Sequence, residues 1–199
     1  MKRRIVVVLL LALSAAAALP SASAQRRRGD GGGRQTVTGT VVGIGGRYAR
    51  SYPLTLRVES YTSPSEISRL NEALQQGGQD GLLRAISGLD SGRIAVGTGV
   101  GVQANVVIST PQPDGGTRLT VLFERTVNFY ELRRGARSQD YRFGYAEIFI
   151  DRDGRGGEGT FIPAAKVRLR DGNTWEVEDF GIFPARIMGV RSRGTVPAR

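Results

Sequence analysis

Apolar and polar residues alternate along much of the chain, a pattern that predicts strands with one buried and one exposed side. In residues 54–59, leucine or valine alternates with threonine, arginine and glutamate. Other valine- and threonine-rich runs are bounded by glycine, proline or aspartate, which are turn residues. Together these runs predict strands at residues 36–44, 54–58, 93–96, 102–109, 117–124, 127–132, 142–150, 160–170, 174–180 and 185–190.

After the second predicted strand the apolar residues recur every three or four positions, which is the spacing of an amphipathic helix. Ser63 can cap a helix that begins at Pro64, and Glu66 completes a capping box with Ser63. Two glycines end this helix, and Asp80 can cap a second, shorter one. The pattern therefore predicts a helical pair near residues 64–76 and 80–88.

One hairpin near the end of the chain can be aligned residue by residue. If residues 171–173 form a three-residue loop, Trp175 faces Leu169 and Glu178 faces Lys166. Apolar pairs then lie on one side of the hairpin and opposite charges lie on the other. A shift by one residue would destroy both sets of pairs, so the sequence specifies this register strongly.

Short links between the predicted strands imply antiparallel neighbours. The expected fold is mainly β (α+β), an antiparallel β-barrel or β-sandwich with the helical pair inserted after the second strand. We expect a single β-rich domain over residues 36–192 and a flexible tail over residues 193–199. Residues 25–35 are rich in glycine and arginine and are predicted to be disordered.

The N-terminal residues predict where the protein works. Residues 2–4 are basic, residues 5–19 are apolar, and residues 22–24 have the small-x-small pattern that signal peptidase cuts. This order is typical of a Sec-type signal peptide over residues 1–24, with cleavage between Ala24 and Gln25. The apolar run is shorter than the about 20 residues of a membrane span. We therefore expect a periplasmic or secreted protein without stable membrane insertion after cleavage.

The chain contains no histidine and no cysteine, which narrows the chemistry open to it. Serine–histidine triads, cysteine nucleophiles, disulfides and structural zinc sites are excluded. We expect no cofactor, no metal and no catalytic residue. The formal net charge is +10, and almost all the cations are arginines, whose planar fork suits carboxylates and phosphates.

The best candidate binding patch in the sequence is an arginine-rich loop. Arg133, Arg134 and Arg137 cluster there, and Tyr141 and Arg142 follow. Arginines beside an aromatic ring bind sugar acids or phosphate through forked hydrogen bonds and stacking. We expect an anionic polysaccharide or envelope component as the partner, and no nucleic acid because the basic residues form no clustered stripe. The leading interpretation is an exported, non-catalytic binding or structural module.

Two alternative functions stay open. One is a hydrolase of cell-wall or polysaccharide substrates that uses carboxylates alone, which needs two carboxylates in one pocket with one desolvated away from arginine. Glu176 and Glu178 are spaced like such a pair, but the hairpin register places each opposite a cation. The other alternative is a small β-barrel that holds an apolar ligand in a cavity lined by residues such as Phe123, Phe129 and Tyr145.

Several segments resemble a group of uncharacterised exported bacterial proteins. The resemblance rests on residues 176–191, EVEDFGIFPARIMGVR, and residues 161–165, FIPAA. Residues 141–150 and the helical stretch at residues 77–83 are similar to that group as well. The resemblance implies export and a single module, and it implies no activity, ligand or catalytic residue.

Overall fold

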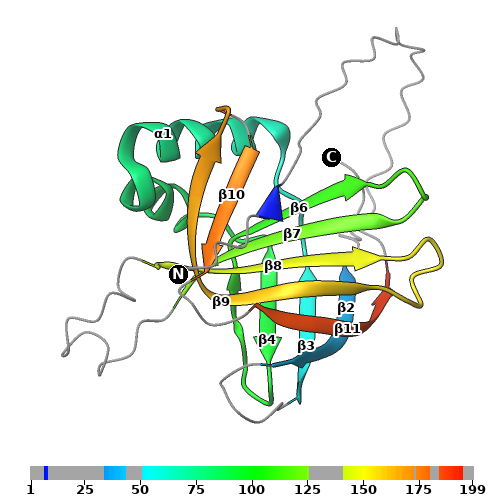
Figure 1. The fold of residues 1–199 in the computed structure, drawn as a ribbon. Helices are drawn as coiled ribbons and strands as arrows, with labels where there is room; N and C mark the ends of the chain where they lie inside the picture. Colours follow the sequence, from blue (N-terminus) through cyan, green and yellow to red (C-terminus); the bar gives the residue numbers. More distant parts are fainter. Residues whose placement is uncertain are drawn as a thin grey trace, which may run out of the picture.

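The structure, a computed structural model, describes residues 34–43, 51–125, 141–172, 174–179 and 184–194 and the backbone of Val7–Val8. In this part of the chain the protein is mainly β, with one helical element and one large antiparallel sheet (Figure 1). The mainly β, antiparallel class is therefore confirmed. The elements are β1 (Val7–Val8), β2 (Gln35–Val42), β3 (Ser51–Val58), α1 (Pro64–Ile86), β4 (Gly92–Val96), β5 (Val102–Ala104), β6 (Val106–Pro111), β7 (Thr117–Glu124), β8 (Phe143–Ile150), β9 (Glu158–Arg170), β10 (Thr174–Asp179) and β11 (Ala185–Arg193).

The main path of the sheet has the order β5-β4-β3-β2-β11-β9-β8-β7-β6. Strand β10 pairs with the last part of β9, and β1 pairs with β10. The path of the described strands is not closed into a barrel, so the barrel alternative is wrong. At the β6 end, Thr62 supplies the hydrogen bonds instead of another strand. Its backbone N–H donates to the carbonyl of Val107 (2.8 Å), and its Oγ1 accepts from the Val107 N–H (3.0 Å).

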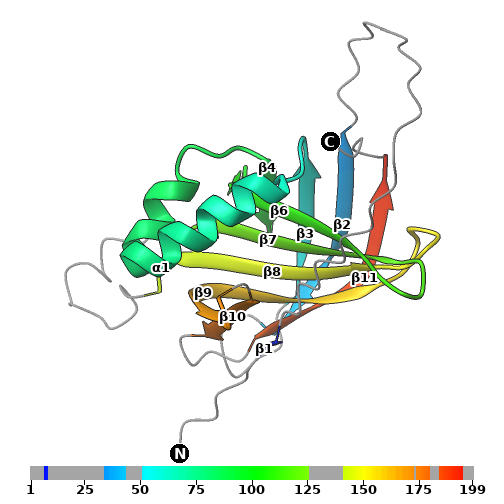
Figure 2. The same ribbon diagram turned by 90° about the horizontal axis from the view of Figure 1, so that it is seen from above.

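Two apolar clusters stabilise the sheet from its two sides. The larger cluster includes Val37 and Leu56 from one half of the sheet and Val121 and Ile148 from the other half. In Figure 2 the strands β2 and β3 cross β7 and β8 steeply, and α1 lies over the β6–β9 half. The second cluster lies between α1 and the strands beneath it, and it includes Leu82, Ile86, Tyr145, Val167 and Trp175.

Helix α1 follows β3, which corresponds to the second strand that the sequence predicts. The helix also begins where the sequence predicts. The Glu66 N–H donates to Ser63 Oγ (3.3 Å), and the Ser63 N–H donates to Glu66 Oε2 (2.7 Å), so the capping box is confirmed. The structure has one helical element from Pro64 to Ile86, and it is kinked at Gly78, so a separate helical pair is not shown. The backbone leaves the helical conformation at Gly78 (φ 56°, ψ −143°), where two helical stretches meet at the kink. Asp80 lies in the helical stretch after the kink, within the bounds of α1.

One predicted strand is interrupted at Asn105. The sequence predicts a continuous strand at residues 102–109, whereas the structure has β5 and β6 on either side of Asn105. The buried Asn105 side chain accepts from the Glu124 N–H (3.0 Å) and donates to the carbonyls of Ile86 and Leu89 (3.1 Å each). These bonds tie the corner of the sheet to the end of α1. The strand predicted at residues 127–132 lies outside the described residues.

The register of the β9–β10 hairpin is confirmed. Trp175 pairs with Leu169, and Glu178 pairs with Lys166, as the sequence predicts. The ion pair differs from the expectation, because Glu178 Oε2 contacts Arg168 (3.0 Å), which lies diagonally across the strands. Arginine reaches this carboxylate because diagonal neighbours in an antiparallel pair are within range of long side chains.

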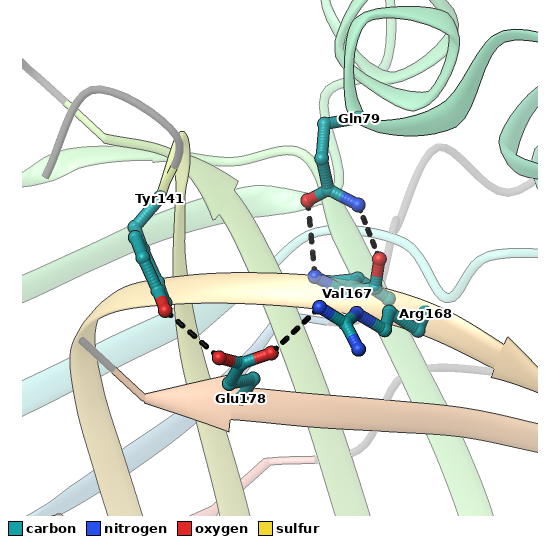
Figure 3. A network of polar contacts seen from close by, with 5 residues as sticks. All are labelled: Gln79, Tyr141, Val167, Arg168 and Glu178. Atoms are coloured by element: carbon teal, nitrogen blue, oxygen red, sulfur yellow. Dashed lines mark hydrogen bonds and ion pairs between the residues drawn. The ribbon is translucent and has the colours of Figure 1, made fainter. Parts of the chain in front are cut away.

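Polar side chains of α1 attach the helix to this hairpin. The Trp175 indole N–H donates to Asn71 Oδ1 (2.7 Å), and both groups are buried. The Gln79 side-chain amide bonds to both the N–H and the carbonyl of Val167 (Figure 3). Gln79 thereby takes the place of a neighbouring strand where β9 extends beyond β8. These contacts fix α1 on the sheet, and among the described residues no helix covers the β2–β3–β11 half.

The predicted signal-peptide cleavage site, Ala24 and Gln25, lies outside the described residues, as do residues 195–199. In the described ranges, no helix is both long enough and apolar enough to cross a membrane.

Candidate functional site

The predicted arginine-rich patch is described only in part. Arg133, Arg134 and Arg137 lie outside the described residues. The Tyr141 hydroxyl donates to Glu178 Oε1 (2.9 Å), so this residue contacts the β9–β10 hairpin (Figure 3). Arg142 lies 3.9 Å from Asp80 of α1. Tyr141 and Arg142 thus connect the residues just before β8 to β10 and to α1.

A different set of basic residues meets on the exposed side of β2, β3, β4 and β11. We call this surface the arginine–threonine face, and each member alternates with residues of the buried core. Successive residues of a strand point to opposite sides, so the members share one side of the sheet. The face consists of Thr36, Thr38, Thr40, Arg57, Arg93, Arg191 and Arg193.

The strand register places these residues in rows across the sheet. Arg193 is opposite Thr36, Thr36 is opposite Arg57, and Arg57 is opposite Arg93. In the next row Arg191 is opposite Thr38. Directly opposed residues have Cβ atoms about 5 Å apart, so Arg57 and Arg93 leave neighbouring strands side by side. Arg93 Nη1 also donates to the Gly101 carbonyl in the β4–β5 connection (3.3 Å).

A β-bulge in β11 brings its two terminal arginines onto this face. The register shifts between Met188 and Arg191, and Gly189 has a φ of 61°. Residues three apart in a regular strand point to opposite sides of the sheet. The bulge adds one residue to β11 and so restores the alternation. Met188 and Arg191 are therefore both exposed on the side of Thr38 and Thr40. Glycine takes the left-handed conformation at the bulge without steric cost.

The arginines of this face lack acidic partners in the described part of the chain. Arg57, Arg93, Arg191 and Arg193 are exposed, and none forms an ion pair with a described carboxylate. Like charges opposite one another on two strands are destabilising. The face therefore holds concentrated positive charge that an anionic ligand could neutralise.

Two carboxylates border the face, and each is already paired with an arginine. Glu59 lies 3.9 Å from Arg34, and Glu158 lies 3.4 Å from Arg186. The second pair lines a shallow pocket of about 160 Å³ between β8, β9 and β11. Phe149, one of the exposed large apolar side chains, lines the same pocket and is 37% exposed.

A buried carboxylate lies beside this pocket. Glu147 is only 6% exposed, and Thr160 of the pocket is opposite it on β9. Burial raises the pKa of Glu147, while Arg118 at 3.7 Å acts in the opposite direction. Glu147 also raises the pKa of the neighbouring buried Tyr145, although burial is the larger cause there. Glu147 is desolvated beside an arginine, which is not the arrangement that the hydrolase alternative requires.

The residues named for an internal ligand cavity do not come together on one side of the sheet. Phe123 belongs to the larger core cluster and stacks with Phe161 at 6.2 Å between ring centroids. Tyr145 lies in the cluster beneath α1, and Phe129 is outside the described residues. In the described ranges, no group of three acidic side chains is arranged to hold a metal ion.

Sequence reasoning missed the arginine–threonine face because its arginines are far apart along the chain. The signal that could have found them is the polar phase of each strand, in which arginine recurs at 57, 93, 191 and 193. Comparison of the chain with protein-family models, with curated proteins and with solved structures gives no match.

Proposed function

We propose that the protein is an exported, non-catalytic binding module whose ligand is an anionic glycan held on the arginine–threonine face. The observation that carries the proposal is the direct opposition of Arg57 and Arg93, neither of which pairs with a described carboxylate. Each guanidinium is a fork of N–H donors for a carboxylate or sulfate, and two of them on adjacent strands can bind neighbouring acidic groups of one ligand.

The geometry of the face favours an extended ligand over a compact one. Its rows span four neighbouring strands about 4.8 Å apart, and threonine hydroxyls lie between the arginines. Hydroxyls can donate and accept hydrogen bonds, which suits the hydroxyl groups of sugars. A polysaccharide that carries acidic groups at intervals matches this mixture of charge and hydroxyl groups.

Two other classes of polyanion fit the face less well. Proteins that bind single-stranded nucleic acid stack the bases on aromatic side chains. The one aromatic residue on β2, β3, β4 and β11, Tyr52, pairs with core residue Val41 and points away from the face. Membrane-surface binding uses apolar side chains inserted among the lipids, and on this side of these strands Met188 is the one large exposed apolar residue.

We also infer that the two halves of the sheet act as a sandwich-like scaffold. The support is the core cluster, which draws buried residues such as Val37 and Ile148 from both halves. Such packing keeps the exposed side of β2 and β3 rigid, so the arginine rows present a fixed spacing to the ligand.

The test is binding of polygalacturonate, a polymer of uronic acids, to the purified chain by isothermal titration calorimetry. We expect the double variant Arg57→Gln/Arg93→Gln to bind at least about tenfold more weakly, which corresponds to about 1.4 kcal/mol. Arg69→Gln is the matched control, because Arg69 is an exposed arginine of α1 on another part of the surface. It should bind within about twofold of the unmodified chain.

Several results would refute the proposal. Absence of polygalacturonate binding is one, and equal binding by the double variant and the control is another. Neutral dextran, single-stranded DNA and vesicles with anionic lipid serve as competitors. Stronger binding to DNA or to the vesicles than to the uronate polymer would replace the glycan with that other polyanion.

A further inference from the structure

We infer that the pocket beside Phe149 binds an uncharged sugar ring of the same glycan, so that the ligand is a polysaccharide in which neutral sugars separate the acidic ones. This inference rests on the proposed function and extends the site beyond its arginines. The pocket is lined by Phe149, Glu158, Gly159, Thr160 and Arg186.

The charges in the pocket disfavour an acidic sugar. Glu158 and Arg186 lie 3.4 Å apart, and the side chain of each is 71% exposed. Because they neutralise one another, the pocket attracts no anion, and the Glu158 carboxylate would repel the carboxylate of a uronic acid. The pair still offers acceptor oxygens and donor N–H groups, and Thr160 adds a hydroxyl. These groups suit the hydroxyls of a neutral sugar.

Phe149 gives the pocket an apolar wall. Its ring is partly exposed on the same side of the sheet as Glu147, although most large apolar residues of the described chain are buried. One face of a pyranose ring carries mainly C–H groups, and burying that face against an aromatic ring removes apolar surface from water. The pocket's about 160 Å³ is below the about 300–1,000 Å³ of pockets for drug-sized ligands, so it suits a single ring.

The register connects the pocket to the arginine–threonine face. Glu158 is opposite Met188 on β11, and Met188 is opposite Thr40 on β2. From Glu158 to Arg57 the path crosses three strand spacings and runs four residues along β2, which is about 20 Å. A chain of several sugars can therefore place one ring against Phe149 and its acidic groups near Arg57 and Arg93.

The experiment compares two polymers against the same variants. Polygalacturonate has only acidic sugars, whereas neutral sugars separate the glucuronates in gellan. We expect Phe149→Ala to weaken gellan binding by about tenfold and to leave polygalacturonate binding within about twofold. Phe149→Trp keeps a flat aromatic ring and should retain gellan binding. Val100→Ala is the control, because Val100 is 85% exposed in a loop outside the pocket.

The two proposals fail in different ways. Unchanged gellan binding by Phe149→Ala, or equal losses for both polymers, overturns the assignment of the pocket and leaves the arginine–threonine face as proposed. Polygalacturonate binding by the Phe149→Ala chain also shows that this variant is folded. If the unmodified chain does not bind polygalacturonate, the proposed function fails, and the pocket assignment fails with it.

Discussion

Repulsion between the opposed arginines of β3 and β4 should lower the stability of the free protein, whether or not a ligand exists. Removing one charge with Arg93→Gln relieves the repulsion from Arg57, its direct neighbour across the strands. Two unit charges at roughly 6 Å in water repel by about 0.7 kcal/mol. Screening reduces this to about 0.6 kcal/mol in about 0.01 M salt and to about 0.1 kcal/mol in about 1 M salt.

The variant should therefore be more stable than the unmodified chain at low salt, and this advantage should disappear at high salt. For a domain of this size, about 0.6 kcal/mol raises Tm by about 1–2 °C. The sharper measurement is a double-mutant cycle with Arg57→Gln, followed by urea unfolding at both salt concentrations. Arg69→Gln on α1 controls for the general loss of one positive charge.

Addition of the glycan should reverse the order of stability. A ligand at a hundredfold excess over its Kd stabilises the folded chain by about 2.7 kcal/mol. If Arg93→Gln weakens binding tenfold, the same ligand concentration stabilises the variant by only about 1.4 kcal/mol. The double-mutant cycle can contradict this reasoning. A coupling free energy between Arg57 and Arg93 that is zero or stabilising at low salt would mean that other groups neutralise these two cations in the free protein.

Three further predictions concern the sheet, the helix and the buried acid. Gly189→Val should lose about 1–2 kcal/mol in urea unfolding, because a side chain strains the left-handed conformation at φ 61°, whereas Gly189→Asn should lose less. Asn71→Ala should lose about 1–3 kcal/mol by leaving the buried Trp175 N–H unpaired, and Ser68→Ala on the exposed side of α1 should lose little. Protonated Glu147 favours the folded state because its pKa is raised there. This stabilisation by the protonated carboxyl is complete below pH 4.5, the ordinary pKa, and is lost as the pH rises through the higher pKa of the folded state. The free energy of unfolding, compared with that of Glu147→Gln, should therefore fall as the pH rises from 4.5 through the folded-state pKa.

The sequence predicted those parts of the fold that depend on local pattern. The capping box at Ser63 and Glu66 forms because both partners lie within one turn of the chain. The β9–β10 register forms because residues 166–178 carry matched apolar and charged pairs on either side of a short loop. In both cases the energetic preference is contained in a short segment, so alternation and turn residues are sufficient to predict it.

The parts that the sequence did not predict depend on contacts between distant segments. Asn105 divides a strand because its side chain satisfies backbone groups of residues 86, 89 and 124. The β11–β2 pairing joins Arg193 to Thr36 across most of the chain and thereby completes the arginine rows. The bulge after Met188 changes which residues face outward, and a single glycine in a strand is a weak signal for it.

The placement of the strand arginines supports the proposal that the arginine–threonine face binds a ligand. A bias toward arginine in the composition explains how many arginines there are, but it does not explain where they are paired. On the other strands of the described sheet, Arg118 and Arg168 contact carboxylates of adjacent strands, and Arg170 contacts neighbouring Asp171. On β3, β4 and β11, only Arg186 has such a partner in the described residues. Selection for stability alone would favour a carboxylate opposite Arg57, as on other strands of the same sheet. The residue opposite Arg57 is instead a second arginine, Arg93. A repulsion that reduces the stability of the free protein is retained when a ligand removes it on binding.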